Sequence, residues 1–308
     1  MAGIFPKRIG LSGVVLLLAL AWSVQGQVRL RTSSAYNQIT VEDAGGYRLL
    51  RFNGSMETRM WLPNPLFGHF EYTEYFQMPL LFNPKSQRML LMGLGGGSMV
   101  RAFQHYYPDI HLDTVELDPK VAQVAKQFFH VKETAKHKIH FSDGRQFLRL
   151  NKTRKYDAIL MDAYTSNQFG THIPFHLATK EFFALASEDL TKEGVLVFNV
   201  IGTYDDWRSD IVGSMYQTLK SVFPHVYHFQ ASDTRNIVML AVKSKEPLTS
   251  TTLKNKVAAL RAARPKLPKS FGPRVARIRA QAPKSAANAG VLTDDFAPPG
   301  GLLKSKKR

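Results

Sequence analysis

Short apolar runs that alternate with helical stretches constrain the fold of this chain more than any other feature. They begin at residue 88 and continue to residue 242. Strands are expected at 89–92, 112–115, 138–141, 157–161, 195–199 and 237–242, and helices near 98–107, 119–129, 144–150, 178–188 and 207–221. Strands that alternate with helices predict an α/β fold with a mostly parallel, doubly wound sheet. Such sheets bind ligands at the carboxyl ends of their strands.

The residues before this segment follow a different pattern. Residues 27–62 alternate apolar and polar positions around turn signals, which predicts an antiparallel sheet of two to four strands. A sheet of this size is not stable alone. We therefore expect residues 27–84 to form a small β-domain with an aromatic-rich connecting helix, packed on a Rossmann-like domain of residues 85–243.

The net charge of +17 belongs mostly to the C-terminal end of the chain. From Lys243 onward there are sixteen basic residues and three acidic ones. Residues 244–308 are therefore expected to form a basic, largely disordered tail with a short helix at 253–263. Because no aromatic residues alternate with its charges, we expect weak contact with anionic membrane surfaces and no specific nucleic-acid partner.

The N-terminus has the pattern of a targeting segment. Lys7-Arg8 precede an uncharged stretch whose apolar centre is residues 14–22, which indicates a signal peptide or membrane anchor over residues 1–26. The protein is then exported or membrane-tethered, or cytoplasmic if the leader is spurious. The chain contains no cysteine, which excludes disulfides, thiolate catalysis and cysteine metal sites.

Three motifs follow three successive predicted strands. The first strand runs into a glycine loop, the second ends in a carboxylate about twenty residues later, and the third is followed by an Asp-Gly pair. Glycines let the backbone and the N–H groups of the next helix approach a ligand, and such a carboxylate can accept both ribose hydroxyls. The aspartate is placed to recognise an adenine edge. The motifs predict a nucleoside site with Gly93, Gly95, Gly97, Glu116, Asp143 and Gly144.

These motifs resemble those of the polyamine aminopropyltransferases, or spermidine synthase-like proteins, over roughly residues 36–242. The resemblance is carried by YNQI at 36–39, YTE at 72–74, GLGGGSMVR at 93–101, VELD at 115–118, DG at 143–144 and YDAILMD at 156–162. It implies a Rossmann-like class I fold and aminopropyl transfer to a polyamine. It also implies that Gln38 contacts the thioether nucleoside, that Glu116 holds the ribose and that Asp143 reads the adenine. Tyr72 is expected to line the acceptor channel, with a role in the core as the alternative.

The chain departs from the family at two places. Gly96 stands where the family's loop has an aspartate that grips the amine of the aminopropyl arm. After the fourth strand, Asp162 matches the first aspartate of a second motif, but Thr165 replaces the other. Asp162 is the candidate general base or amine-positioning carboxylate. Residues 162–177 and a terminal motif at 292–298 resemble a divergent branch of the family.

Several functions therefore stay open. The chain could transfer an aminopropyl group from decarboxylated S-adenosylmethionine, transfer a methyl group from intact S-adenosylmethionine, or bind a nucleoside or amine without catalysis. The missing carboxylate at Gly96 predicts that the intact donor binds at least as tightly as the decarboxylated one, unless Asp294 or Asp295 folds into the pocket. His172 and His176 have no third ligand nearby, so no metal is expected. The acceptor is undetermined, and a homodimer is open.

Overall fold

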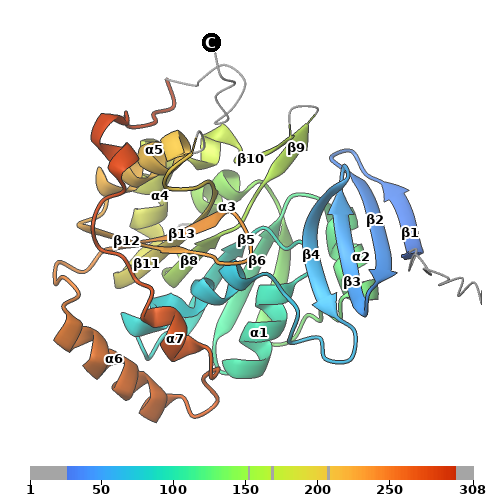
Figure 1. Ribbon diagram of the computed structural model, residues 1–308, viewed down its shortest axis with the longest axis horizontal. Helices are drawn as coiled ribbons and strands as arrows, with labels where there is room; N and C mark the ends of the chain where they lie inside the picture. Colours follow the sequence, from blue (N-terminus) through green and yellow to red (C-terminus); the bar gives the residue numbers. More distant parts are fainter. Residues whose placement is uncertain (1–25, 152, 168–169, 207–208, 296–308) are drawn as a thin grey trace, which may run out of the picture.

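The computed structural model describes residues 26–151, 153–167, 170–206 and 209–295 of the chain (Figure 1). The predicted leader lies almost entirely outside these residues, so it stays a prediction. No helix within the described ranges is long and apolar enough to cross a membrane.

A seven-stranded sheet forms the centre of the molecule (Figure 1). Its strands are, in spatial order, β12 (His225–Gln230), β13 (Asn236–Val242), β11 (Leu190–Ile201), β8 (Tyr156–Met161), β5 (Arg88–Met92), β6 (His111–Glu116) and β7 (His137–Phe141). β13 is antiparallel to both of its neighbours, and the other pairs are parallel. The predicted α/β fold is confirmed. β12 was not predicted, because His225, His228 and Gln230 interrupt its apolar residues.

Helices cover both faces of this sheet, and three of them begin at side-chain caps. The helices are α1 (Ser98–Tyr106), α2 (Pro119–Phe128), α3 (Gly144–Leu150), α4 (Lys180–Asp189) and α5 (Ser209–Lys220). Asp118, Asp143 and Thr179 each accept a hydrogen bond from a backbone N–H in the first turn of α2, α3 and α4, as helix caps do. One core lies between the sheet, η1 (Glu71–Leu81) and α1, and a second lies between the sheet, α4 and α5.

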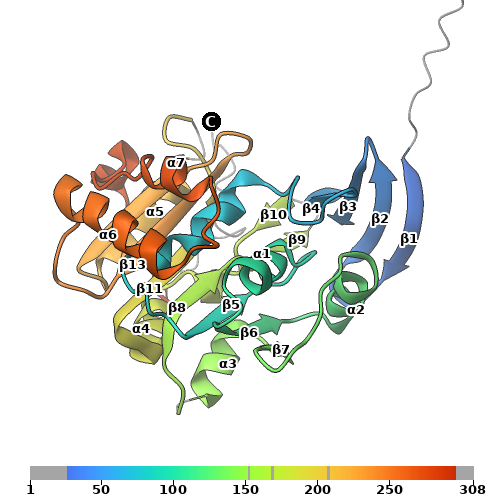
Figure 2. The ribbon, with the colours of Figure 1, turned by 90° about the horizontal axis from the view of Figure 1, so that it is seen from below.

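The N-terminal residues form the predicted small antiparallel sheet. Its order is β1 (Gln27–Ser33), β2 (Gln38–Ala44), β3 (Tyr47–Phe52) and β4 (Ser55–Trp61). Its inner face packs on α2, and Figure 2 shows the sheet beside that helix at one end of the molecule. Asp118 at the start of α2 also accepts hydrogen bonds from Ser34 and Asn37. The small sheet is therefore fixed beside the carboxyl end of β6.

The prediction of a largely disordered C-terminal tail is wrong for residues 250–295, apart from the short helix predicted at 253–263, which is present. This segment forms α6 (Ser250–Ala263), α7 (Phe271–Val275) and η3 (Lys284–Asn288). Its scattered apolar side chains, among them Leu260, Phe271 and Leu292, are buried against the domain. Arg274 and Arg277 form ion pairs with Glu71 of η1. Composition averages over these residues and does not show that particular side chains, such as Phe271 and Arg274, contact the domain.

A short hairpin and a short helix follow the carboxyl end of β8. β9 (Thr165–Asn167) and β10 (Gly170–His172) form a hairpin after β8, and η2 (Phe175–Leu177) follows it. The carboxyl end of β8, which they follow, lies beside the carboxyl end of β5, where the glycine loop begins. This edge carries the candidate site.

Candidate active site

A cavity of about 330 Å³ lies between the N-terminal sheet and the carboxyl ends of β5, β6 and β8. Its walls include the glycine loop, η1, the start of the β9–β10 hairpin and η2. This volume is within the usual range for small-molecule sites. The cavity brings together most of the residues that the sequence predicted: Tyr72, Gly93, Gly95, Glu116, Asp143, Gly144 and Asp162.

The glycine loop reaches the cavity because its backbone adopts conformations that favour glycine. Gly93 has a φ of 91°, and a Cβ atom there would lie 2.3 Å from the backbone oxygen of Asp162. Only glycine lets the ends of β5 and β8 approach this closely. Gly95 lines the cavity, whereas Gly97 is the residue that begins α1 and is not among the lining residues.

Glu116 holds the loop in place from the end of β6. Its Oε2 accepts a hydrogen bond from the Leu94 N–H at 2.9 Å, and its Oε1 accepts one from the Asp118 N–H at 2.9 Å. Burial raises the pKa of Glu116, while these backbone donors oppose that rise. The carboxylate is thus oriented by the backbone at the cavity wall, where the sequence predicts contact with a ribose.

Asp143 lies at the end of β7 with both oxygens engaged. Oδ1 accepts a hydrogen bond from the Gln146 N–H in α3, and Oδ2 is 2.7 Å from Nε2 of His176. The hydrogen bond with His176 lowers the pKa of Asp143. His176, which the sequence analysis considered only as a metal ligand, lines the cavity beside Asp143. Asp143 therefore lies at the cavity wall with His176 as its neighbour, and its contact with an adenine stays a prediction.

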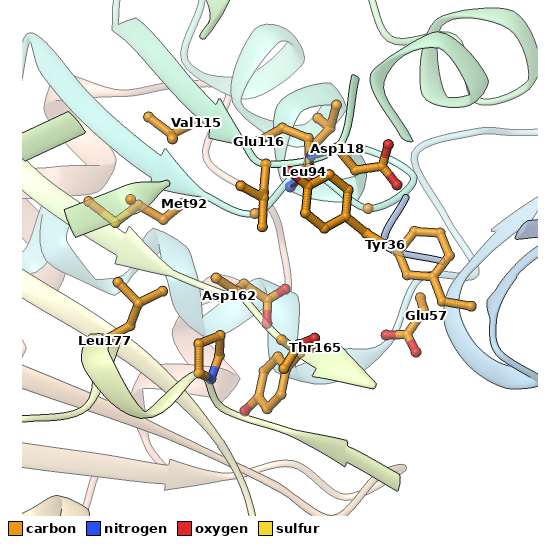
Figure 3. A pocket seen from close by; sticks show the side chains of 18 of the residues that line it. Tyr36, Glu57, Met92, Leu94, Val115, Glu116, Asp118, Asp162, Thr165 and Leu177 are labelled. Atoms are coloured by element: carbon orange, nitrogen blue, oxygen red, sulfur yellow. Dashed lines mark hydrogen bonds between the residues drawn. The ribbon is translucent and has the colours of Figure 1, made fainter. Parts of the chain in front are cut away.

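Asp162 occupies the end of β8, at the centre of the cavity (Figure 3). Tyr72 donates a hydrogen bond to Oδ2 at 3.1 Å, and Asn199 donates one to Oδ1 at 2.8 Å. Asn236 in turn donates to Oδ1 of Asn199 at 3.0 Å. Burial raises the pKa of Asp162 to about 6 against the effect of its two donors. Tyr72, whose own pKa burial raises, stays protonated and can keep donating.

Gln38 is not part of the cavity wall. Its side chain is exposed, and its backbone N–H donates to Asn53. Side chains alternate along a strand, and the next residue, Ile39, faces the buried side toward α2. Gln38 consequently faces away from the interior. The neighbouring Tyr36 and Asn37 line the cavity in its place.

Two functional candidates were missed by the sequence analysis. Asn199 holds Asp162, and one signal for it existed: it is a polar residue in the apolar run of β11, which pairs with β8 in parallel, Phe198 opposite Met161. Glu57 reaches the cavity from β4 and has no comparable signal. No local motif marks it, because a partly polar strand is typical of any small antiparallel sheet.

Gly96 occupies the position of the family's loop aspartate, and Thr58 of the N-terminal sheet packs directly against it. Its N–H donates to Oγ1 of Thr58 at 2.9 Å. A Cβ atom at Gly96 would lie 2.6 Å from Cγ2 of Thr58. A side chain at this position would clash with the Thr58 side chain, so a glycine fits the close approach of Thr58.

The cavity is strongly acidic. Five carboxylates line it, and the described lining residues include no lysine or arginine: the acidic residues are Glu57, Glu116, Asp118, Asp143 and Asp162. Such a surface attracts cations and repels anions. Among the described residues, no three His, Asp or Glu side chains are grouped so that they could hold a metal ion.

The terminal carboxylates do not reach this cavity. Asp294 accepts hydrogen bonds from Arg145 at 2.7 and 2.5 Å and from Thr179 at 2.7 Å, and Asp295 is exposed. The terminal motif does fold back, but it attaches to the starts of α3 and α4. The hypothesis that Asp294 or Asp295 replaces the carboxylate missing at Gly96 is therefore wrong.

Comparison with known proteins agrees with this geometry. Residues 69–252 match the spermine/spermidine synthase domain. The polyamine aminopropyltransferase of Vibrio vulnificus is 32% identical over 254 residues, which are 78% of this chain and 82% of that protein. The crystal structure of a probable spermidine synthase from Corynebacterium glutamicum superposes with a TM-score of 0.66 at 20% identity, over 87% of this chain and 97% of that one.

The fold is shared with methyltransferases. Human methyltransferase-like protein 13, solved with SAH, superposes with a TM-score of 0.56 at 25% identity, over 63% of this chain and 91% of that one. The family match and the Vibrio vulnificus relative nevertheless cover most of the chain, including the glycine loop and the residues Glu116, Asp143 and Asp162. This chain belongs to the spermine/spermidine synthase family.

Proposed function

We propose that this chain is an aminopropyltransferase that uses decarboxylated S-adenosylmethionine as donor and a small amine as acceptor. The nitrogen lone pair of the acceptor attacks the aminopropyl carbon next to the sulfonium. The carbon–sulfur bond breaks, and its electrons return to sulfur to give the neutral thioether methylthioadenosine. The acceptor nitrogen loses one proton in the process.

The observation that carries this proposal is the acidic cavity with Asp162 at its centre. A decarboxylated donor has two positive charges, a sulfonium and an ammonium, and an amine acceptor adds another in its protonated form. A cavity with five carboxylates and no lysine or arginine among its described lining residues suits such cations. It suits intact S-adenosylmethionine less well, because that donor also carries a carboxylate.

Asp162 has the properties of a general base for this reaction. Its pKa of about 6 leaves it ionised at neutral pH, so it can take the proton from the acceptor ammonium and free the nitrogen lone pair that attacks. The donors Tyr72 and Asn199 fix its orientation. We propose that Glu116 and Asp143 hold the ribose and adenine at the ends of β6 and β7, as the family resemblance implies.

Product analysis with the full chain tests this proposal. The protein is incubated with decarboxylated S-adenosylmethionine and a set of diamines, and methylthioadenosine and the extended amine are measured by mass spectrometry. We expect amine-dependent release of methylthioadenosine, abolished in Asp162→Asn and kept in the control Asp295→Asn. Asp295 is exposed and lies outside the cavity.

Two results would overturn the proposal. Formation of S-adenosylhomocysteine from the intact donor, without methylthioadenosine from the decarboxylated one, would make the protein a methyltransferase. Tight binding of methylthioadenosine without turnover of any donor, across the amines tried, would indicate a binding protein instead.

A further inference from the structure

Glu57 carries a buried oxygen atom with no hydrogen-bond partner. It lies on β4 and lines the cavity, and its Oε1 is inaccessible to solvent yet accepts no hydrogen bond from the described residues. Buried polar atoms in proteins nearly always have a partner. An unsatisfied carboxylate oxygen is costly to bury. A hydrogen-bond donor that enters the cavity would remove this cost.

The groups around Glu57 favour a donor that carries a positive charge. Figure 3 shows Glu57 and Asp162 facing the same space from opposite sides. The groups that interact electrostatically with Glu57 are Asp162 at the end of β8, Tyr72 of η1 and Tyr164 after β8. None of them is a cation. Burial raises the pKa of Glu57 to about 7; a hydrogen bond from Ser55 opposes this rise, and the charge of Asp162 adds to it.

β4 also brings Glu57 to the donor end of the cavity. The next residue, Thr58, contacts Gly96 through the hydrogen bond from the Gly96 N–H to its Oγ1. The glycine loop, whose Leu94 N–H is bound by Glu116, therefore lies directly beside this part of β4. The loop, Glu57 and Asp162 thus line the same cavity.

We propose that Glu57 binds the ammonium of the donor's aminopropyl arm and thereby selects the decarboxylated donor over intact S-adenosylmethionine. This inference rests on the proposed function. The ammonium would supply the donor that Oε1 lacks, whereas the carboxylate of the intact donor would meet Glu57 and Asp162 as like charges. The expectation that the intact donor binds at least as tightly was based on Gly96 alone and overlooked Glu57.

Calorimetric titration of the full chain tests the assignment. The ligands are methylthioadenosine, which has no ammonium, and decarboxylated and intact S-adenosylmethionine. The variants are Glu57→Gln and the control Glu42→Gln, which removes a carboxylate of the same sheet that pairs with Arg51 outside the cavity. We expect Glu57→Gln to weaken binding of the decarboxylated donor by about 10- to 100-fold and binding of methylthioadenosine by less than about threefold.

The preference for the decarboxylated donor should then shrink in Glu57→Gln and persist in Glu42→Gln. Unchanged affinity for the decarboxylated donor in Glu57→Gln would overturn the assignment. This holds even if the KM of the acceptor rises in that variant. An equal loss for methylthioadenosine would overturn it as well, because that ligand has no ammonium to lose.

A measurement on the unaltered protein covers the case in which Glu57→Gln does not fold. Because Glu57 is partly protonated near neutral pH, binding of the ammonium should release a fraction of a proton. Titrations in buffers of different ionisation enthalpy should detect this release with the decarboxylated donor and not with methylthioadenosine. Equal proton release for both ligands would refute the role of Glu57. Donor binding that depends on Glu57 but leads to no turnover would support this inference while refuting the proposed transferase activity.

Discussion

Replacing Glu57 by glutamine should stabilise the unliganded protein at alkaline pH and leave it nearly unchanged at acidic pH. The folded protein holds the Glu57 proton more tightly than the unfolded chain, because burial raises its pKa from an ordinary 4.5 to about 7. Ionisation of Glu57 therefore favours unfolding. The stability that the folded protein gains by holding this proton is fully present below the pKa of Glu57 in the unfolded chain. It is lost as the pH rises through about 7.

The magnitude follows from the size of this shift. Each pKa unit corresponds to about 1.4 kcal/mol, so a rise from 4.5 to about 7 amounts to about 3 kcal/mol in full. Glu57 is only partly buried at the cavity wall, where water screens part of the effect. Since glutamine resembles the protonated carboxyl and cannot ionise, we expect a gain of about 1–3 kcal/mol at about pH 8 and close to none at about pH 4.

Urea unfolding at the two pH values measures this difference directly. Equal denaturant slopes in both proteins would show that only stability has changed. Glu42→Gln serves as the control, because its ion pair with Arg51 is at the surface and its loss should cost about 0–1 kcal/mol at either pH. A gain for Glu57→Gln that is the same at both pH values, or a loss at the higher one, would refute the reasoning. The variant would then be stabilised or destabilised by packing rather than by removal of a buried charge.

Three further predictions concern the site and the C-terminal segment. Asp162→Asn should lower kcat by at least about 100-fold, and in the unaltered enzyme kcat/KM should fall as the pH drops below about 6, since the base must be ionised; a flat profile there would exclude Asp162 as the base. Glu116→Ala and Asp143→Ala should each weaken binding of adenosyl ligands by about 1–3 kcal/mol in calorimetry, and unchanged affinity in both would remove the nucleoside assignment. Phe271→Ala should destabilise the protein by about 3 kcal/mol or more in urea unfolding, because Phe271 is buried against the domain; a loss below about 1 kcal/mol would show that α7 is not firmly packed.

The nucleoside end of the site could be predicted from the sequence because its residues are tied to strand ends. The glycine loop, Glu116 and Asp143 each follow an apolar run that periodicity identifies. β5, β6 and β7 are neighbours and run in parallel, so their carboxyl ends meet at one edge. The local pattern and the sheet topology together predict that these residues lie close together. Asp162 also follows the carboxyl end of a parallel strand, β8, and lies at the same edge.

Gln38 shows where the family resemblance was too coarse. The motif at residues 36–39 was placed correctly beside the cavity, but only Tyr36 and Asn37 line it. Which residues of a strand face a ligand depends on the face that packs on its neighbour, and here Ile39 packs toward α2. A shift of one residue reverses the side of a strand, so a motif alone does not decide it.

The sequence by itself determined the α/β fold, the small N-terminal sheet, the glycine loop and the carboxylates at the ends of parallel strands. The tertiary structure alone decided what lies across the cavity from them. Glu57 and Thr58 meet Gly96 and Asp162 only because the N-terminal sheet docks on α2, and the C-terminal segment is ordered only because its basic and apolar residues find partners in the domain. These contacts join residues far apart in the chain, and periodicity and composition report only on neighbours in sequence. The position of Glu57 is therefore set by the docking of the N-terminal sheet, while the positions of the glycine loop, Glu116, Asp143 and Asp162 are set by the strands.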